Sequence, residues 1–223
     1  MGRVEAVSIV EAVAADIRRG LFAGDLTSEA QLTEAEVATN YDVARPTAKA
    51  AIEKLVAEGL LRRDRNKTAR VPLLGPEDVS DLYLSRLFLE TQVVRRLAER
   101  RLVPKIATNS NAALFAVEEP TFADVVEPVV RFHQTLVDAM GSPRVSRLYN
   151  SLMAEMRLCM AQMQSQHLLS AAIIAQEHRE IIDAIAVGDP DAAVVAVTQH
   201  LHNAERRLFP GTSSSLGLQP QVQ

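Results

Sequence analysis

Basic side chains are concentrated in one short segment of a chain that is otherwise acidic. Residues 44–70 carry eight lysines and arginines against three acids, a local charge of +5, whereas the 223-residue chain has a net charge of −4. The eight basic positions are Arg45, Lys49, Lys54, Arg62, Arg63, Arg65, Lys67 and Arg70. Guanidinium and ammonium groups at this density suit the phosphate backbone of a nucleic acid, although charge alone would equally fit a solvated surface.

Other features of the chain exclude whole classes of protein. Its single cysteine, Cys159, rules out a framework of internal disulfides and is expected to fill core space in a reducing cytoplasm. No stretch reaches the roughly 18 uninterrupted apolar residues of a membrane span, and residues 1–20 lack the apolar core of a signal peptide. The length and the 48% share of apolar residues favour a globular, cytoplasmic protein of two domains.

Two helices are expected before the basic segment. Apolar residues at spacings of three and four predict a helix over residues 7–19, which Gly20 is placed to end. Thr33 and Glu36 have the spacing of a capping box, in which each side chain accepts a hydrogen bond from a backbone N–H of the first turn. This pair predicts that a second, short helix begins at Thr33.

The basic segment itself predicts a helix followed by a hairpin. The helix runs from residue 44 or 45 to residue 58, and its first turn tolerates Pro46 because N–H groups there lack intrahelical partners. Its expected buried side consists of Ala48, Ala51, Ile52 and Leu55. Residues 60–63 and 69–71 are typical of two short strands around a turn at 64–68. Helix, turn, second helix and basic hairpin together predict a winged helix-turn-helix.

Beyond the basic segment the chain is expected to be helical. Residues 72–76 contain two prolines and a glycine and indicate a linker. The expected helices cover residues 77–101, 105–117, 121–140, 143–166, 168–187 and 190–208. The fold class is therefore mostly α, with an N-terminal winged helix-turn-helix domain and a C-terminal all-helical bundle. The expected divisions are a DNA-binding domain over 1–71, a linker over 72–76, a helical effector-binding and dimerisation domain over 77–209 and a disordered tail over 210–223.

Both halves of the chain resemble one known family. The stretch EVATNYDVARPTAKAAIEKLVAEGLLRRDRNKTARV is similar to the signature of the GntR regulators, and the rest resembles FCD, the helical ligand-binding domain of the FadR subgroup. The FCD landmarks are R-x-x-x-E from Arg86 to Glu90, Phe132-His133, the run from Glu177-His178 to Gly188-Asp189, and Ala193 with His200-Leu201. The resemblance covers nearly all of residues 7–209.

The chain departs from the family pattern in the part that reads DNA. Ala44 stands where the family has an N-cap serine, which removes a side-chain cap worth about 1 kcal/mol. Lys49 replaces an arginine and Ala50 replaces a glutamate inside the recognition helix. The wing has residues 65–68, Arg-Asn-Lys-Thr, in place of a glycine-rich tip. We expect these changes to alter the operator rather than to abolish DNA binding.

Five side chains are predicted to contact DNA. Arg45, Thr47 and Lys49 fall in the first turns of the recognition helix, the part that enters the major groove in this motif. Arg45 suits a bidentate contact to guanine, whereas Lys49 is a point charge that suits phosphate. Arg65 and Lys67 at the tip of the wing are expected to reach the backbone or the minor groove. The alternative is that these charges merely solvate a helix and a hairpin.

The resemblance also implies a metal site. Many FCD domains bind a divalent metal through one aspartate and three histidines, and the histidines correspond to His133, His178 and His200 on three expected helices. Val129 stands in place of the aspartate, and Glu127 lies too far around the helix to replace it. Imidazole suits zinc or nickel, so we expect a three-histidine site that binds metal more weakly than its four-ligand relatives. Without metal, the imidazoles would hydrogen-bond an acidic effector directly.

Arg86 is the predicted effector-binding residue. In related domains the arginine of R-x-x-x-E points into the pocket and pairs with a carboxylate, which implies that the effector is a small organic acid. A guanidinium makes two parallel hydrogen bonds to a carboxylate, and this geometry supports the assignment. The alternative is an internal ion pair between Arg86 and Glu90, four residues on.

Together these expectations describe a sequence-specific, DNA-binding transcriptional regulator and not an enzyme. Because most members of the family repress, repressor is the default, acting as a homodimer on a pseudo-palindromic operator and controlled by a small organic acid. Two alternatives stay open. In the first, the C-terminal domain only pairs subunits. In the second, the three-histidine site belongs to a metal-dependent enzyme, which is less favoured because no general base accompanies the motif.

Overall fold

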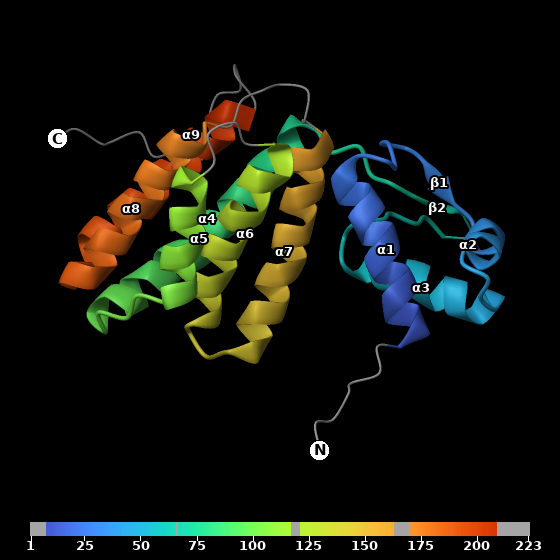
Figure 1. Ribbon diagram of the computed structural model, residues 1–223, viewed down its shortest axis with the longest axis horizontal. Coiled ribbons are helices and arrows are strands. Elements are labelled where there is room, and N and C mark those ends of the chain that lie inside the picture. Colours follow the sequence, from blue (N-terminus) through green and yellow to red (C-terminus); the bar gives the residue numbers. More distant parts are fainter. Residues whose placement is uncertain (1–7, 66, 117–120, 163–169, 209–223) are drawn as a thin grey trace. The chain divides into compact units, whose positions relative to one another are not determined.

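Two compact units make up the structure, a computed structural model of the chain (Figure 1). The structure describes residues 8–65, 67–116, 121–162 and 170–208. Residues up to 74, together with 157–162, form the first unit, and the other described residues form the second. The predicted tail over 210–223 lies outside the described residues.

The first unit begins with a helix that is longer than its sequence pattern predicted. Its elements are α1 (Ile9–Ala23), β1 (Gln31–Leu32), α2 (Glu34–Asn40), α3 (Arg45–Ala57) and β2 (Ala69–Arg70). Gly20 does not end α1, as the sequence suggested; Gly24 does, in the left-handed conformation at φ 82°. The extra turn buries Leu21, which is 1% exposed, and this gain in apolar burial outweighs the modest helix penalty of an interior glycine.

The local signals around α2 and α3 are confirmed. Thr33 and Glu36 form the predicted capping box: the Thr33 hydroxyl accepts from Glu36 N, and the Glu36 carboxylate accepts from Thr33 N, each at 3.1 Å. The buried side of α3 is the one expected, namely Ala48, Ala51, Ile52 and Leu55. Ala44 precedes α3 and provides no side-chain cap, so this helix depends on packing of that apolar side.

The predicted hairpin is wrong in one strand. Residues 60–63 contribute only a single bridge, Arg62 to Arg70, instead of a strand. β2 pairs instead with β1, antiparallel, in the register Gln31 to Arg70 and Leu32 to Ala69. β1 lies in a stretch expected to be a loop, because two residues are too short to produce a period of two and their partner is far along the chain.

Six helices complete the described chain. They are α4 (Pro76–Glu99), α5 (Lys105–Phe115), α6 (Phe122–Asp138), α7 (Pro143–Gln162), α8 (Ala171–Val187) and α9 (Pro190–Leu208). α4 packs chiefly against α9 and also contacts α6 and α8, while α5 packs against both α6 and α8 (Figure 1). This arrangement surrounds α4 with helices and brings α6, α8 and α9 close enough to share one buried site.

Glycine and proline set the limits of these helices. Pro76, which the sequence assigned to the linker, is the first residue of α4, and Gly75 is its N-cap. Gly188 is the C-cap of α8 at φ 79°, and Gly141, at φ 69°, follows the end of α6 at Asp138, so these helices end at or near the expected residues 187 and 140. The mostly α fold class, a winged helix-turn-helix followed by a helical bundle, is likewise confirmed. None of the described helices has the length and apolarity that crossing a membrane requires.

Candidate functional site

The start of α3 carries the three predicted base-reading side chains. Arg45 and Lys49 are exposed and Thr47 is half-buried, whereas Ala48, on the other side of the helix, is fully buried. Lys49 has a loose ion pair with Glu53, at 3.7 Å between two side chains that are each more than half exposed. A pair of this kind contributes only about 0.3–0.5 kcal/mol, so Lys49 remains available to another anion.

The basic residues of the wing differ in whether an ion pair within the protein already holds them. Arg70 donates hydrogen bonds to both carboxylate oxygens of Glu29, at 2.6 and 2.7 Å, and so helps to hold β2 in place. Arg65 and Lys67 are exposed. Lys67 contacts Asp64 at 3.2 Å, but both side chains are more than half exposed, which makes the pair weak. Arg65 and Lys67 are therefore the wing residues best placed to contact a phosphate.

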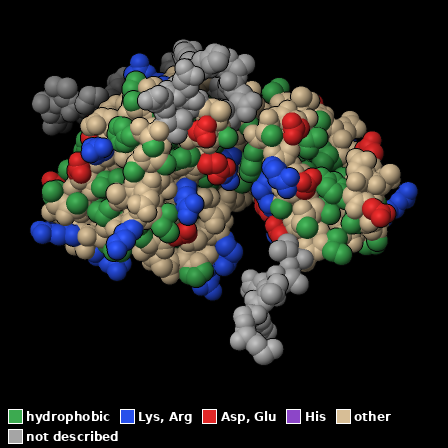
Figure 2. Space-filling model, viewed as in Figure 1, with side chains coloured by type: hydrophobic (Ala, Val, Ile, Leu, Met, Phe, Trp, Pro, Cys, Tyr) green, Lys and Arg blue, Asp and Glu red, His purple; other side chains and the backbone are tan. Residues whose placement is uncertain are grey.

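The three predicted histidines come together inside the helical unit. His133 lies on α6, His178 on α8 and His200 on α9, and one ring nitrogen from each lies within 4.8 Å of the other two. The three side chains are 0%, 0% and 2% exposed. Among the described residues, no histidine reaches the face drawn in Figure 2. Three different helices thus build one closed imidazole cluster.

Two of the imidazoles are oriented by carboxylates. His133 Nδ1 lies 2.7 Å from Glu90 Oε2, and His200 Nδ1 lies 2.8 Å from Glu177 Oε2. An ionised carboxylate only accepts, so both Nδ1 atoms donate and each neutral ring keeps a lone pair at Nε2. The two Nε2 atoms face each other at 3.1 Å. Lone pairs this close repel each other unless a proton or a metal cation lies between them.

His178 completes the cluster without a partner of its own. Both of its ring nitrogens are buried and lack a hydrogen-bond partner within the part of the chain that the structure describes. Its ring stacks on Phe132, with centroids 3.8 Å apart and planes 6° from parallel. Burial holds its pKa well below the usual value, so the imidazole is neutral. A metal ion binds the lone pair of a neutral imidazole nitrogen, and a buried nitrogen without a hydrogen-bond partner has that lone pair available.

A buried ion pair lies directly behind His133. Arg86 Nε donates to Glu90 Oε1 at 2.8 Å, and the Tyr149 hydroxyl donates to the same oxygen at 2.7 Å. Burial alone would raise the pKa of Glu90, but the charge of Arg86 and the hydrogen bonds from His133 and Tyr149 offset it and hold this pKa well below the usual range. Burial lowers the pKa of His133 to about 4, against the opposing effect of Glu90. Glu90 is therefore charged, and His133 is neutral at pH 7.

Arg86 has a donor left over. Its Nη2 is buried and has no hydrogen-bond partner among the described residues. Arg86 and His133 bind the two oxygens of the same Glu90 carboxylate, which links the guanidinium to the histidine cluster through one residue. The ion pair with Glu90 thus occupies only part of the guanidinium.

Glu177 forms the matching support behind His200. Arg207 donates to both of its carboxylate oxygens, at 2.8 and 2.7 Å, and Asn203 donates to one of them at 2.9 Å. Burial would raise the pKa of Glu177, but the hydrogen bonds from Arg207 and His200 lower it to about 2. Each outer imidazole of the cluster is therefore held by a charged carboxylate, and each carboxylate is held by an arginine.

Comparison with known proteins assigns each of the two units to a known domain. Residues 81–203 match the FCD domain, and residues 9–71 match the bacterial regulatory proteins of the gntR family. The chain belongs to the GntR family. A GntR helix-turn-helix joined to an FCD domain makes this protein a ligand-controlled, DNA-binding transcriptional regulator, as the sequence predicted.

The relatives of this GntR protein with names are transcriptional regulators, and the similarity extends over most of their length. A Paenarthrobacter nicotinovorans protein named "Probable D-xylose utilization operon transcriptional repressor" is 27% identical over 207 residues, 87% of this chain and 84% of the relative. The repressor NanR of Cronobacter sakazakii is 25% identical over 209 residues, covering 84% and 78%. A GntR regulator structure from Rhodococcus sp. RHA1 shares the fold, with a TM-score of 0.78, 24% identity and 93% and 100% coverage.

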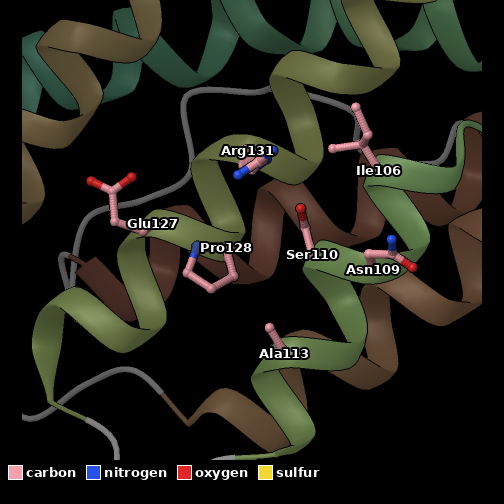
Figure 3. Close-up of a pocket in the computed structure, with 7 residues that line it drawn as sticks. All are labelled: Ile106, Asn109, Ser110, Ala113, Glu127, Pro128 and Arg131. Carbon is pink, nitrogen blue, oxygen red and sulfur yellow. The ribbon is translucent and has the colours of Figure 1, made fainter.

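In this GntR protein the position of the family's aspartate is apolar. Val129 is 7% exposed and packs with Leu114, Val125 and Ile174 in a hydrophobic cluster. Glu127, the nearest carboxylate before it on α6, lines a groove between α5 and α6 and points away from Ser110 and Arg131 (Figure 3). The described structure therefore gives no carboxylate on α6 to the histidine cluster.

The GntR protein's supporting residues were missed by the sequence analysis. Glu90 was named only as a partner of Arg86, and Glu177 only as the residue before His178. Glu177 supports His200 on a different helix, although its neighbour in sequence is a member of the cluster itself. Tyr149 and Arg207 carried no signal, because their roles depend on helices that meet only in the folded bundle.

Proposed function

We propose that this protein is a repressor that binds a pseudo-palindromic operator as a homodimer and releases it when a small organic acid enters the FCD domain. The observation that supports this most is that one chain has Arg45 and Lys49 exposed on a recognition helix whose other side is buried, and also a closed cluster of three histidines beside a partly free Arg86. A ligand acts in this way only if it binds one conformation better than the other. The relatives named as repressors support this direction of control.

The division of labour follows the predicted boundaries. Residues 1–71 bind DNA, residues 72–76 are the linker at which the two parts pivot, and residues 77–209 bind the effector and pair the subunits. Because its proposed target is operator DNA, we expect the protein to act in the cytoplasm. An enzyme is not favoured, because the carboxylates near the cluster, which would be the candidates for a general base, are already held by arginines.

DNA footprinting with and without effector tests this function directly. The expected result is protection of a two-fold-related sequence near the regulator's own gene, and loss of that protection when a panel of sugar acids and short organic acids is added. Protection that no acid changes, together with no thermal stabilisation by any acid, would favour the alternative that the FCD domain only pairs subunits.

Lys67 is proposed to contact phosphate from the wing. The variant Lys67→Ala should weaken binding to every DNA sequence alike and lower the slope of log K against log salt concentration by about one unit per subunit. Fluorescence anisotropy on operator and unrelated duplexes at several salt concentrations measures this slope. Arg70→Ala is a poor comparison because Arg70 holds Glu29, so Lys105→Ala on α5 is the control. A loss confined to the operator would make Lys67 a base reader.

The histidine cluster fits a divalent metal. Two metal–nitrogen bonds of about 2.0–2.1 Å span at most about 4.2 Å, so nitrogens already within 4.8 Å need only a small inward shift. His133, His178 and His200 would hold zinc or nickel, and the metal would supply a positive charge for an acid's carboxylate. A solved FCD domain with this fold, that of TM0439, is known in a zinc-bound form, at 17% identity and a TM-score of 0.50.

Restoring the missing carboxylate should strengthen metal binding. Val129 lies one helical turn before His133, so Val129→Asp offers a fourth ligand and should raise the affinity for zinc by about tenfold or more. Titration against a chromogenic chelator with tag-free protein measures this, with Val129→Asn as the isosteric, uncharged control. If Val129→Asp binds zinc no better than the natural chain, the cluster does not hold metal through these three imidazoles.

Arg86 is proposed to receive the effector's carboxylate. Its Nη2 has no partner among the described residues, and it shares the Glu90 carboxylate with His133. A carboxylate bound there would satisfy this buried donor and complete the coordination of the metal at the same time. The ion pair with Glu90 then orients the guanidinium and leaves Nη2 free to bind the effector's carboxylate.

A second copy of the chain is the proposed partner of the exposed apolar side chains on α4 and α7. Phe88 is 68% exposed and Leu148 is 70% exposed, and the Tyr149–Glu90 hydrogen bond shows that the two helices are neighbours at this level. A two-fold dimer buries the same patch on both subunits. Phe88→Asp should therefore yield a monomer in analytical ultracentrifugation, whereas the equally exposed Val195→Asp on α9 should not. A dimeric Phe88→Asp protein would move the interface elsewhere.

A further inference from the structure

A cavity outside the histidine cluster lies between α5 and α8. Its volume is about 430 Å³, within the range of roughly 300–1,000 Å³ that small-molecule sites occupy. The lining residues are Thr108, Asn111, Ala112 and Phe115 from α5, and Arg179, Ile182 and Asp183 from α8. None of them belongs to the metal or effector site described above, so this cavity has no role in the proposed regulation.

The cavity contains a buried acceptor that lacks a donor. Asn111 is 4% exposed, and its Nδ2 donates to the Ala175 carbonyl at 3.0 Å. Because a carbonyl only accepts, this bond fixes the amide with its nitrogen toward Ala175 and its oxygen turned away. Asn111 Oδ1 is buried and has no hydrogen-bond partner among the described residues. An unsatisfied buried carbonyl costs free energy, and an N–H or O–H group that reached it would remove that cost.

Two exposed side chains of opposite charge also line the cavity. Arg179 and Asp183 are four residues apart on α8, so both project toward the same side of the helix. The Arg179 guanidinium lies over the Phe115 ring, 5.0 Å from its centroid, which holds the cation at the cavity wall. The remaining wall is the apolar surface of Phe115, Ile182 and Ala112. The cavity therefore offers a cation, an anion, a neutral acceptor and an apolar surface together.

We propose that this cavity binds a free α-amino acid with an apolar side chain. The ammonium group donates to Asn111 Oδ1 and to the Asp183 carboxylate, and the carboxylate accepts from Arg179 and from the Thr108 hydroxyl. The apolar side chain then lies against Phe115 and Ile182. An amine alone would leave Arg179 without an anion, and an acid alone would leave Asn111 Oδ1 without a donor.

The neighbouring groove between α5 and α6 lacks this combination. Figure 3 shows Glu127 pointing outward from that groove, away from Arg131, and Pro128 lining it from α6. No side chain lining that groove has an unsatisfied buried polar atom among the described residues. The cavity between α5 and α8 is therefore the one that calls for a ligand.

Calorimetric titration of the full chain in EDTA tests the proposal. L-leucine and L-phenylalanine are the probes, and their analogues without the ammonium group (4-methylpentanoate, 3-phenylpropanoate) or without the carboxylate (3-methylbutylamine, phenethylamine) are the matched comparisons. The variants are Arg179→Gln and Asp183→Asn, and Glu180→Gln, an exposed change on the same helix outside the cavity, is the control. EDTA keeps metal at the histidine cluster from contributing.

The expected result is saturable binding of one amino acid per chain. Each single variant and each truncated analogue should bind about tenfold more weakly or worse, and Glu180→Gln should bind like the natural chain. The proposal would be overturned if L-leucine and L-phenylalanine both failed to bind at concentrations up to millimolar. Binding of equal strength in Arg179→Gln and Asp183→Asn would also overturn it, because the ligand would then occupy another site.

Discussion

Replacing Arg45 with alanine is expected to weaken operator binding by about 30-fold or more. A bidentate arginine–guanine contact contributes about 1–3 kcal/mol of discrimination, and a two-fold dimer makes it twice, once in each half-site. Arg45 is exposed at the first residue of α3, where a recognition helix meets the base edges. Quantitative footprinting on the operator and on versions with one base changed per half-site measures both the affinity and the base preference.

The comparison variants separate base reading from charge. Arg45→Lys keeps the charge but loses the planar fork, so it should retain nonspecific binding and still lose the preference at one position per half-site. Arg19→Ala removes an equally exposed arginine from α1 and should leave the footprint unchanged. If Arg45→Ala binds the operator as tightly as the natural protein, Arg45 does not belong to the reading surface.

What the sequence predicted correctly was local. The Thr33–Glu36 capping box and the stops at Gly141 and Gly188 are decided by a few adjacent residues, and the structure contains all of them. The buried side of α3 follows from apolar periodicity within a single helix. Each of these signals depends on contacts within about one or two turns, so sequence spacing alone is sufficient to determine them.

What the sequence could not predict depends on contacts between distant residues. β1 exists only because β2 supplies its hydrogen-bonding partners from the other side of α2 and α3. Gly20 has the same local signature as Gly24, and the choice between them is made by the burial of Leu21 against the rest of the unit. Neither outcome is encoded in a short window of residues.

The candidate site divides in the same way. The three histidines were found because each stands at a recognisable family landmark. Their supports were not, because Glu90 reaches His133 across 43 residues and Glu177 reaches His200 across 23. The sequence treated Arg86 as either an effector ligand or a partner of Glu90. The structure has the ion pair and, beside it, a guanidinium nitrogen without a partner.

The largest stability effect is expected from Glu90→Gln. Glu90 is 2% exposed and balances the charge of Arg86, which is itself 3% exposed. The amide keeps one acceptor oxygen, so it can accept from Tyr149 or from His133 but not from both, and it leaves the guanidinium as an uncompensated buried charge. Breaking a buried pair in this way costs about 3–5 kcal/mol, which corresponds to a fall in Tm of about 10 °C for a protein of this size. Because Glu90 also orients His133, zinc affinity should fall about 10- to 100-fold.

A double variant shows whether the unpaired charge is the cause. Arg86→Met combined with Glu90→Gln removes the guanidinium, so thermal unfolding should recover most of the lost Tm although Glu90 is still absent. Zinc affinity should not recover, since the carboxylate that holds His133 Nδ1 is still missing. Glu180→Gln on the exposed side of α8 controls for the loss of one surface carboxylate and should change the Tm little. If Glu90→Gln alone unfolds at the natural temperature, Arg86 is not a buried cation that depends on Glu90, and the arrangement proposed for the effector site fails with it.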